Sequence, residues 1–96
     1  MTKFMKNQDM DGKKQTFIIP APEAHSVLLA GDFTHWQNWA IPMRRQRGGL
    51  WKATVQLFPG TYHYRFIVDG QWRDDPQSNC HVPNPYGGRD SIREVD

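Results

Sequence analysis

Residues 50–72 read LWKATVQLFPGTYHYRFIVDGQW, and apolar and polar side chains alternate along most of this stretch. From residue 51 to residue 57 every second side chain is apolar, and the side chains between them are polar. The alternation resumes over 61–68, where one face carries Tyr62, Tyr64, Phe66 and Val68. A period of two is typical of a strand with one buried face. The two runs and the Phe58-Pro59-Gly60 connection between them predict an antiparallel hairpin.

Further short strands are predicted on both sides of this stretch. Asp69-Gly70 favours a tight turn with positive φ, after which the chain should return as a strand. The other predicted strands are 14–19, 25–30, 71–73 and 91–95, the last of them at a sheet edge. At least six short strands with frequent turns, and no helical period over three turns, predict an all-β fold of the β-sandwich type.

Composition limits the number of domains and the kinds of partner. Aromatic residues make up 12% of the 96 residues, and each ring can remove about 150–250 Å² from water, so a two-layer core is feasible. We expect a flexible leader over 1–13 and one folded domain over 14–96. The net charge of +2 is too small to indicate nucleic acid or an anionic membrane as a partner. The basic cluster of Arg44, Arg45 and Arg47 is interpreted as a solvated turn.

The location is predicted from the cysteine count and the absence of targeting patterns. A single cysteine, Cys80, excludes an internal disulfide. Residues 1–14 lack the apolar segment of a secretory signal, and no apolar run approaches the roughly 20 residues of a membrane helix. These observations favour a reducing, cytoplasmic location without membrane association.

No arrangement of residues indicates catalysis or metal binding. Asp74 and Asp75 are adjacent, so on a strand they would point to opposite faces, whereas a glycosidase needs two carboxylates about 5–9.5 Å apart across one bond. Asp75-Pro76 is more typical of a turn. The four histidines have no metal-ligand spacing, and no nucleophile elbow or phosphate-binding loop is present. We therefore expect neither an enzyme nor a cofactor.

Large aromatic rings in a polar segment indicate a binding surface. Residues 33–39, FTHWQNW, form a turn-like segment with two tryptophans and a phenylalanine. We expect Phe33 and Trp39 to pack on the core, and Trp36 and Trp72 to lie at the surface. Arg65 should point away from the core, and Trp72 can reach the same outer face across the Asp69-Gly70 turn. An indole ring beside a cationic donor suits a sugar, which has an apolar C–H face and a rim of hydroxyls. Two such rings at an angle would fit a curved α-1,4-glucan better than a flat chain.

Two segments resemble a known family. GDFTHW at 31–36 and PGTYHYRFIVDGQWRDDP at 59–76 closely resemble the glycogen-binding domains of the family 48 carbohydrate-binding modules. These include the module of the β subunit of AMP-activated protein kinase and the N-terminal domains of isoamylases and branching enzymes. The resemblance covers about 14–95. It implies an early-set immunoglobulin-like β-sandwich that binds α-glucans such as glycogen, starch or maltodextrins.

The resemblance also implies a set of binding residues. Trp36 and Trp72 match the two stacking platforms, and Arg65 stands where the family has a Lys or Arg that donates to glucan hydroxyls. In the kinase-type domains a bulky apolar residue of the last loop inserts into the glucan ring and is followed shortly by an Asn that bonds to glucan hydroxyls. Here the matching segment is 86–90, so Tyr86 is the inserted or supporting residue and Asp90 replaces the Asn. Asp accepts hydrogen bonds but cannot donate as the amide does.

Two alternatives to glucan binding are considered. The same fold can serve as an immunoglobulin-like protein-interaction or scaffold module that has lost glucan binding and docks a partner chain through edge strands and exposed tryptophans. Retention on glycogen and release by maltodextrin would distinguish glucan binding from this module. A module that does bind glucan can in addition recruit a protein partner to glycogen. A nucleic-acid binder could stack bases on Trp36 and Trp72, but acidic residues are interspersed near the candidate site, so we expect no nucleic-acid partner.

Overall fold

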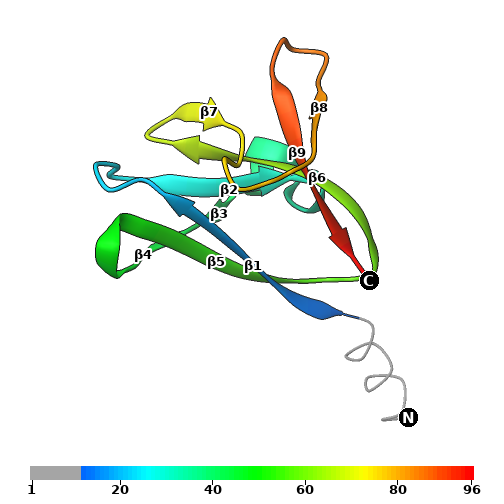
Figure 1. Ribbon diagram of the computed structural model, residues 1–96, viewed down its shortest axis with the longest axis horizontal. Coiled ribbons are helices and arrows are strands. Elements are labelled where there is room, and N and C mark those ends of the chain that lie inside the picture. The colour runs from blue at the N-terminus through cyan, green and yellow to red at the C-terminus, as the bar shows by residue number, and fades with distance from the viewer. Residues whose placement is uncertain (1–11) are drawn as a thin grey trace.

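The computed structural model describes residues 12–96, which form two antiparallel sheets packed face to face (Figure 1). The smaller sheet has the strand order β1 (Lys13–Pro20), β5 (Leu50–Leu57) and β4 (Arg44–Arg45). Strand β1 already begins at Lys13, and the rest of the leader predicted for 1–13, apart from Gly12, lies outside the described residues. No helix among residues 12–96 is long and apolar enough to cross a membrane.

The larger sheet carries the surface on which the candidate site lies. Its strands are, in order, β3 (Ile41–Pro42), β2 (Val27–Gly31), β6 (Gly60–Val68), β9 (Arg89–Val95) and β8 (His81–Pro83), and β7 (Gln71–Arg73) pairs with β6. Within residues 12–96, three short 3₁₀ turns complete the fold: η1 (Asp32–Thr34), η2 (Trp36–Trp39) and η3 (Arg47–Gly49). The prediction of an all-β sandwich is confirmed.

The core lies between the sheets and is rich in aromatic rings. Phe17 of β1 meets Tyr64 of β6 edge to face with ring centroids 4.9 Å apart, and Tyr64 meets Phe66 at 5.9 Å. All three rings are buried, as is Trp51, whose indole nitrogen donates to the Ala21 carbonyl. Fully burying one such side chain stabilises the fold by about 1.5–3 kcal/mol. The apolar faces predicted for 51–57 and 61–68 therefore do face the core, with Val55 and Tyr62 only partly buried.

The hairpin predicted across Phe58-Pro59-Gly60 is wrong. Strand β5 pairs with β1 and β4, whereas β6 pairs with β2, β7 and β9, so the connection crosses from one sheet to the other. Both strands direct apolar side chains at the same core. Their alternation is therefore equally compatible with neighbours in one sheet and with strands that face each other across the sandwich.

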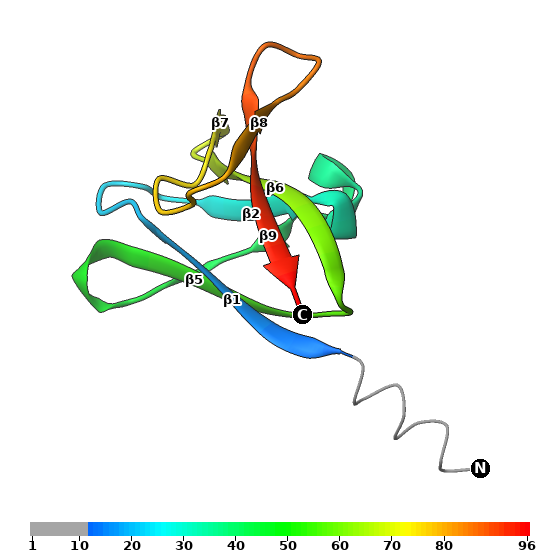
Figure 2. The same cartoon turned by 45° about the vertical axis from the view of Figure 1, so that its right-hand side comes forward.

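The position predicted for the last strand is also wrong. The strand predicted at 91–95 was expected at an edge, but β9 lies between β6 and β8. The edge is formed by β8, three residues of a Pro-rich segment in which no strand was predicted. Val82 pairs with Asp90, and a short loop over 84–88 joins the two strands. Figure 2 shows this β8–β9 hairpin extending beyond the rest of the sheet.

The predicted turn at Asp69-Gly70 is confirmed. Asp69 has φ 49° and Gly70 has φ 83°, the signs of a type I′ turn, and Ile67 of β6 pairs with Trp72 of β7. The Asp69 carboxylate Oδ1 accepts hydrogen bonds from the backbone nitrogens of His25 at 2.8 Å and Ser26 at 2.9 Å. The bond from His25 is the main reason why the pKa of Asp69 lies below its ordinary value. This turn fixes where Trp72 emerges.

The basic cluster is exposed, as predicted, but is more ordered than a turn. Arg44 and Arg45 form β4, and Arg47 begins η3. The Arg45 guanidinium lies 5.6 Å from the centroid of the Trp51 ring and donates to the Pro22 carbonyl at 2.7 Å. Arg45 therefore covers one end of the core as well as facing solvent.

Candidate functional site

The outer face of the larger sheet carries the side chains of β6 that alternate with those pointing into the core. His63, Arg65 and Ile67 lie on this face, because Tyr64 and Phe66 point into the core. Register places Ile67 opposite Trp72 and His63 opposite Ile92. Residues that pair directly lie on one side of a sheet, so strands β6, β7 and β9 build a common outer surface.

Trp36 and Trp72 meet on this surface. Their ring centroids are 6.4 Å apart and their planes are inclined by 53°. Trp72 is 41% exposed and Trp36 is half-buried, whereas Ile67, which pairs with Trp72, is buried. The two predicted surface tryptophans, 36 positions apart in sequence, thus form one angled apolar surface. We call Trp36 and Trp72 the tryptophan pair.

A local network holds Trp36 in an unusual backbone conformation. His35 and Trp36 have φ values of 51° and 58°, in the left-handed region that side chains other than glycine rarely adopt. The Thr34 hydroxyl accepts a hydrogen bond from the Gly31 nitrogen at 2.9 Å and donates to the Trp36 carbonyl at 2.7 Å. Gly31 is needed because a Cβ there would lie 2.6 Å from the His63 carbonyl oxygen. Left-handed residues cost about 1–3 kcal/mol each and cluster at functional sites.

Arg65 lies beside the tryptophan pair. Its guanidinium carbon is 5.7 Å from the centroid of the Trp72 ring, a cation–π distance. The Nε atom of Arg65 is buried and has no hydrogen-bond partner in the described part of the chain. A Cβ at Gly88 would lie 2.9 Å from Nη1 of Arg65, so the loop before β9 needs a glycine to approach the guanidinium so closely. Three of the predicted site residues, Trp36, Arg65 and Trp72, therefore come together.

Tyr86 and Asp90 have different environments. Tyr86 is 93% exposed in the loop between β8 and β9, and its backbone nitrogen donates to Oδ1 of Asn84. Asp90 is buried: Oδ1 accepts from Nδ2 of Asn84 at 3.0 Å, and Oδ2 lies 3.2 Å from Nδ1 of His63. The role of Asp90 toward glucan hydroxyls stays a prediction, and both of its oxygens have partners within the protein.

The structure corrects the expectation for Trp39 and adds residues that sequence reasoning missed. Phe33 packs on the core as predicted, with its ring centroid 5.8 Å from that of Phe17. Trp39, expected to do the same, is 71% exposed at the end of η2. Its place in the 3₁₀ turn depends on the left-handed residues before it, and the sequence gives no signal of them. His63 could have been noticed because it alternates with Arg65, but nothing in the sequence marked Asn84.

The remaining acidic pair forms a structural cluster. The buried Asp75 carboxylate accepts from the Tyr64 hydroxyl at 2.6 Å and from the Gln77 nitrogen at 2.9 Å, which closes the predicted turn. Burial raises the pKa of Tyr64, and the bond to Asp75 raises it further. Burial opposes ionisation of Asp74, but the hydrogen bond from Arg89, at 2.6 Å, a backbone hydrogen bond and the charge of Arg89 together lower the pKa of Asp74.

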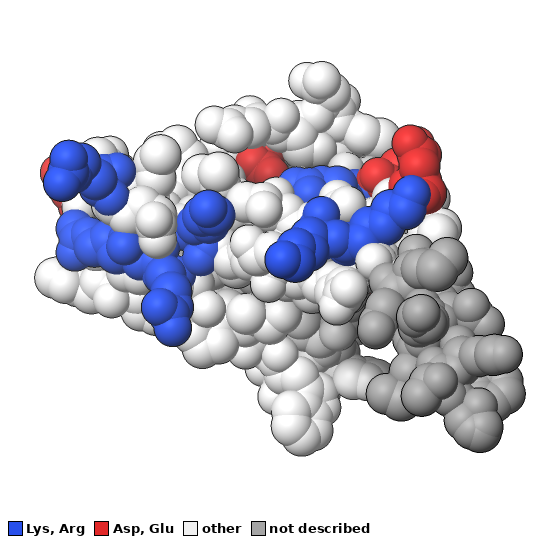
Figure 3. All heavy atoms as spheres, turned by 90° about the horizontal axis from the view of Figure 1, so that it is seen from below, with Lys and Arg blue, Asp and Glu red and all other residues white. Residues whose placement is uncertain are grey.

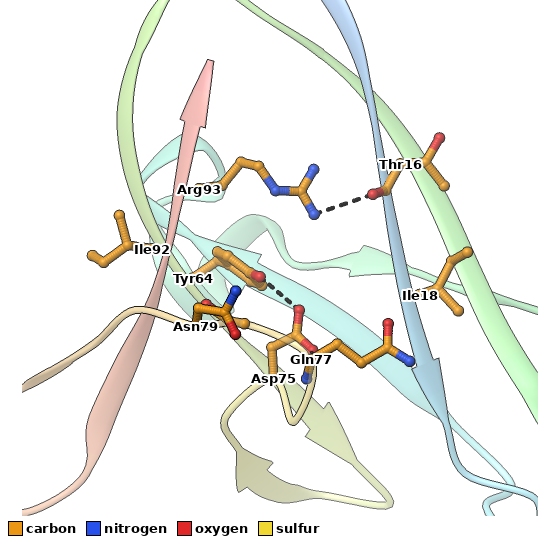
Figure 4. Close-up of a pocket in the computed structure, with 9 residues that line it drawn as sticks. Thr16, Ile18, Tyr64, Asp75, Gln77, Asn79, Ile92 and Arg93 are labelled. Atoms are coloured by element: carbon orange, nitrogen blue, oxygen red, sulfur yellow. Dashed lines mark hydrogen bonds between the residues drawn. The ribbon is translucent and has the colours of Figure 1, made fainter.

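A hollow of about 280 Å³ opens beside this cluster, between β1 and β9 (Figure 4). Its polar groups are largely bonded to each other: the Tyr64 hydroxyl donates to Asp75, and the Arg93 guanidinium donates to the Thr16 carbonyl at 3.2 Å. The guanidinium carbon of Arg93 also lies 4.1 Å from the centroid of the Phe17 ring. None of the predicted site residues lines this hollow, and residues 12–96 contain no group of three side chains suited to a metal ion.

Comparison with known proteins gives the family. Residues 14–95 match the family model described as the glycogen recognition site of AMP-activated protein kinase. PTST homolog 2, a chloroplastic protein of Arabidopsis thaliana, is 42% identical over 59 residues, which are 62% of this chain and 11% of that protein. The 1,4-alpha-glucan branching enzyme GlgB of a Synechococcus species is 32% identical over 78 residues, 80% of this chain and 10% of the enzyme.

A kinase subunit is also similar over a shorter segment. The SNF1-related protein kinase regulatory subunit beta-2 of Arabidopsis thaliana is 49% identical over 43 residues, 44% of this chain and 15% of that subunit. In all three relatives the match covers a small part of a longer protein. The chain belongs to the family 48 carbohydrate-binding modules, which include the glycogen recognition site of AMP-activated protein kinase, and it has their immunoglobulin-like β-sandwich fold.

Proposed function

We propose that this domain binds α-glucans without acting on them, by stacking sugar rings on Trp36 and Trp72 and donating hydrogen bonds from Arg65. The observation that carries the proposal is the tryptophan pair, with its planes inclined by 53° and the Arg65 guanidinium alongside. A pyranose ring presents an apolar face to an indole and a rim of hydroxyls to hydrogen-bonding groups. The nitrogens at the end of Arg65 supply donors beside the rings.

The angle of the tryptophan pair favours a curved glucan. Two rings inclined by 53° cannot both lie flat against an extended, planar chain. Successive sugars of an α-1,4-linked chain turn relative to one another, so two of them can each meet one ring. We infer glycogen, starch or maltodextrins as the ligand class. Tyr86, at 93% exposure, is proposed to insert into or support the turn of the glucan from the β8–β9 loop.

Binding without catalysis is proposed from what the acidic residues do. The carboxylates of Asp74 and Asp75 are occupied by Arg89 and Tyr64, and Asp90 is occupied by Asn84 and His63. The relative named as a branching enzyme shares only 10% of its own length with this chain. We therefore assign the domain to glucan attachment, with affinity in the micromolar to millimolar range for short oligosaccharides because flexible ligands lose entropy on binding.

A protein-interaction function is the second candidate, and one observation favours it. The segments 13–20 and 44–57, which supply the smaller sheet, contain six basic residues and no acidic one: Lys13, Lys14, Arg44, Arg45, Arg47 and Lys52. All six are exposed, and Figure 3 shows Lys and Arg side chains spread over this face. An acidic protein partner would suit this surface. Such binding should weaken steeply with salt, whereas glucan binding should not.

The test of glucan binding is a titration with maltoheptaose followed by tryptophan fluorescence. We expect saturable quenching of the natural protein and its loss in Trp72→Ala. Phe58→Ala is the matched control, because it removes another exposed aromatic ring, 56% exposed, in the connection between β5 and β6. Unchanged melting curves would show that the variants are folded. No response up to millimolar sugar in the natural protein would reject the proposal and turn attention to a protein partner.

A further inference from the structure

A chain of hydrogen bonds crosses the outer face of the larger sheet next to Arg65. It runs from Asn84 in the β8–β9 loop to Asp90 of β9 and on to His63 of β6, with atom distances of 3.0 and 3.2 Å. Asp90 and His63 lie on the same face, since His63 pairs with Ile92 and Asp90 is two residues before Ile92. The chain therefore links the exposed loop to the surface of β6.

The geometry fixes the direction of each hydrogen bond. Oδ1 of Asn84 accepts from the backbone nitrogens of Tyr86 at 2.9 Å and Gly88 at 3.0 Å. The other end of the amide, Nδ2, is therefore the donor to Oδ1 of Asp90. A carboxylate only accepts hydrogen bonds, so Oδ2 of Asp90 must accept from a protonated Nδ1 of His63. In neutral imidazole the proton on Nδ1 leaves a lone pair on Nε2.

This arrangement determines which hydrogen-bonding role the exposed ring nitrogen of His63 has. The His63 side chain is 40% exposed, whereas that of Asp90 is 12% exposed, so the imidazole is bonded to a largely buried carboxylate and is itself partly open to solvent. Arg65 is two residues along the same strand, about 7 Å away on the same face. Arg65 can only donate hydrogen bonds, and Nε2 of His63 can only accept one. Sugar hydroxyls do both, so adjacent hydroxyls of one glucan can be met by the two side chains.

We propose that His63 contacts the glucan directly, its Nε2 accepting a hydrogen bond from a sugar hydroxyl, and that Asp90 and Asn84 are the residues that position it. This inference rests on the glucan-binding function proposed above. Two donors, Nδ2 of Asn84 and Nδ1 of His63, flank the Asp90 carboxylate. An amide that directed its NH₂ group at Nδ1 of His63 would favour the tautomer with the proton on Nε2, which cannot accept a hydrogen bond from a sugar.

If His63 contacts the glucan, its protonation should change the affinity for glucan. A purely structural role of His63 does not predict such a change. The charged groups that face it are Asp90 of β9, Asp32 of η1, whose carboxylate accepts from the His63 backbone nitrogen at 2.8 Å, and Arg65 on its own strand. Histidine side chains gain a proton between about pH 8 and pH 5. A proton on Nε2 turns the acceptor into a second donor beside Arg65, and the sugar hydroxyl that donated to Nε2 loses its acceptor. The affinity for glucan should therefore fall as the pH is lowered over this range.

The experiment compares maltoheptaose affinity at about pH 8 and pH 5.5 in the natural protein and in His63→Gln. We expect the natural protein to bind about threefold to tenfold more weakly at the lower pH, the equivalent of one lost hydrogen bond. His63→Gln should bind about equally at both, because its side chain does not titrate. Other histidines remain in this variant, so a persisting pH dependence would assign the effect to them and overturn the role of His63.

Asp90→Asn tests the positioning role in a double-mutant cycle. It should weaken binding at pH 8 by a similar factor in the natural protein and have little further effect in His63→Gln. Equal effects in both backgrounds would show that Asp90 does not act through His63. If Asp90→Asn fails to fold, the pH comparison of His63→Gln decides alone. If the natural protein binds no maltoheptaose at either pH, the proposed function fails and this inference with it, whereas pH-independent binding by the natural protein rejects only the role of His63.

Discussion

Gly88 and Arg65, 23 residues apart in sequence, approach so closely that a single added methyl group would touch the guanidinium. The Cβ of any other residue at position 88 would lie 2.9 Å from Nη1 of Arg65 and 3.4 Å from Nδ2 of Asn84. The β8–β9 loop therefore packs directly against the Arg65 side chain, which we propose donates to the glucan. A substitution at Gly88 should therefore displace the guanidinium and change glucan binding.

Gly88→Ala should weaken glucan binding without unfolding the domain. The methyl group meets the far end of a flexible side chain, so the guanidinium can move aside at low cost, but it then leaves its place beside Trp72. We expect maltoheptaose affinity to fall at least about threefold, by loss of one hydrogen bond, while the melting temperature changes little. Binding equal to that of the natural protein would show that the position of Arg65 does not matter.

Arg65→Met should separate the contribution of the charged donors from that of packing. Methionine keeps an unbranched stem over the Trp72 ring but has no N–H group. Hydrogen bonds to charged groups contribute about 1.5–3 kcal/mol, so we expect affinity to fall about tenfold or more. Stability should be kept or slightly raised, because the buried Nε donor without a partner disappears. Isothermal titration and urea unfolding would measure the two effects, and a large loss of stability would contradict this account.

Tyr64→Phe should destabilise the fold and leave glucan binding intact. The hydroxyl is the partner of Oδ2 of Asp75, a carboxylate that is 5% exposed. Removing a partner from a buried polar group costs about 1–3 kcal/mol, more for a charged one. Tyr62→Phe is the matched control: its hydroxyl donates to the Phe58 carbonyl in an exposed region, so its removal should cost less. Urea unfolding would check the difference, and equal losses would contradict it.

The stability of the domain should fall as the solution becomes acidic. The pKa of Asp69 and that of Asp74 lie below the ordinary value of 3.8. A carboxyl with a lowered pKa in the folded state stabilises the fold above its unfolded pKa, and this contribution is lost as pH falls through the folded pKa. The free energy of unfolding should therefore drop from about pH 4 downward.

Asp69→Asn isolates one of these two groups. Asparagine tolerates the positive φ of this turn and keeps an oxygen acceptor for the backbone nitrogens of His25 and Ser26. Its side chain does not titrate, so the decline in stability below pH 4 should be shallower than in the natural protein. Urea unfolding at several pH values would measure this, and identical slopes would show that Asp69 does not contribute.

The sequence predicted which face of each strand is buried better than it predicted which strands pair with each other. Alternation located the core side of β5 and β6 correctly, because burial depends on a local period of two. It misjudged their pairing, because strands in facing sheets show the same pattern. The type I′ turn at Asp69-Gly70 was predictable since few dipeptides accept its backbone angles. The short strand β8 has only three residues, too few to show a period.

The candidate site was predictable to the extent that its residues lie on regular strands or match the family. Arg65 and Trp72 follow from alternation and a recognisable turn. The exposure of Trp39 follows from the left-handed conformations of His35 and Trp36, and nothing in the sequence marks these two residues as left-handed. The hydrogen bonds of Asp90 depend on Asn84 and His63, which only the paired strands bring together. Such contacts between distant residues cannot be inferred from one sequence.

The crossing from β5 to β6 bears on how fast the chain folds. Leu57 and Gly60 are close in sequence but belong to different sheets, so this connection closes no local ladder. Strand β5 must instead pair with β1, in which Thr16 lies opposite Thr54 at a separation of 38 residues. Among the pairings of β5 and β6, only β6 with β7 and β4 with β5 join near neighbours along the chain. Folding dominated by such distant pairings takes milliseconds to seconds, and the β6–β7 hairpin that carries Trp72 is the segment best placed to form first.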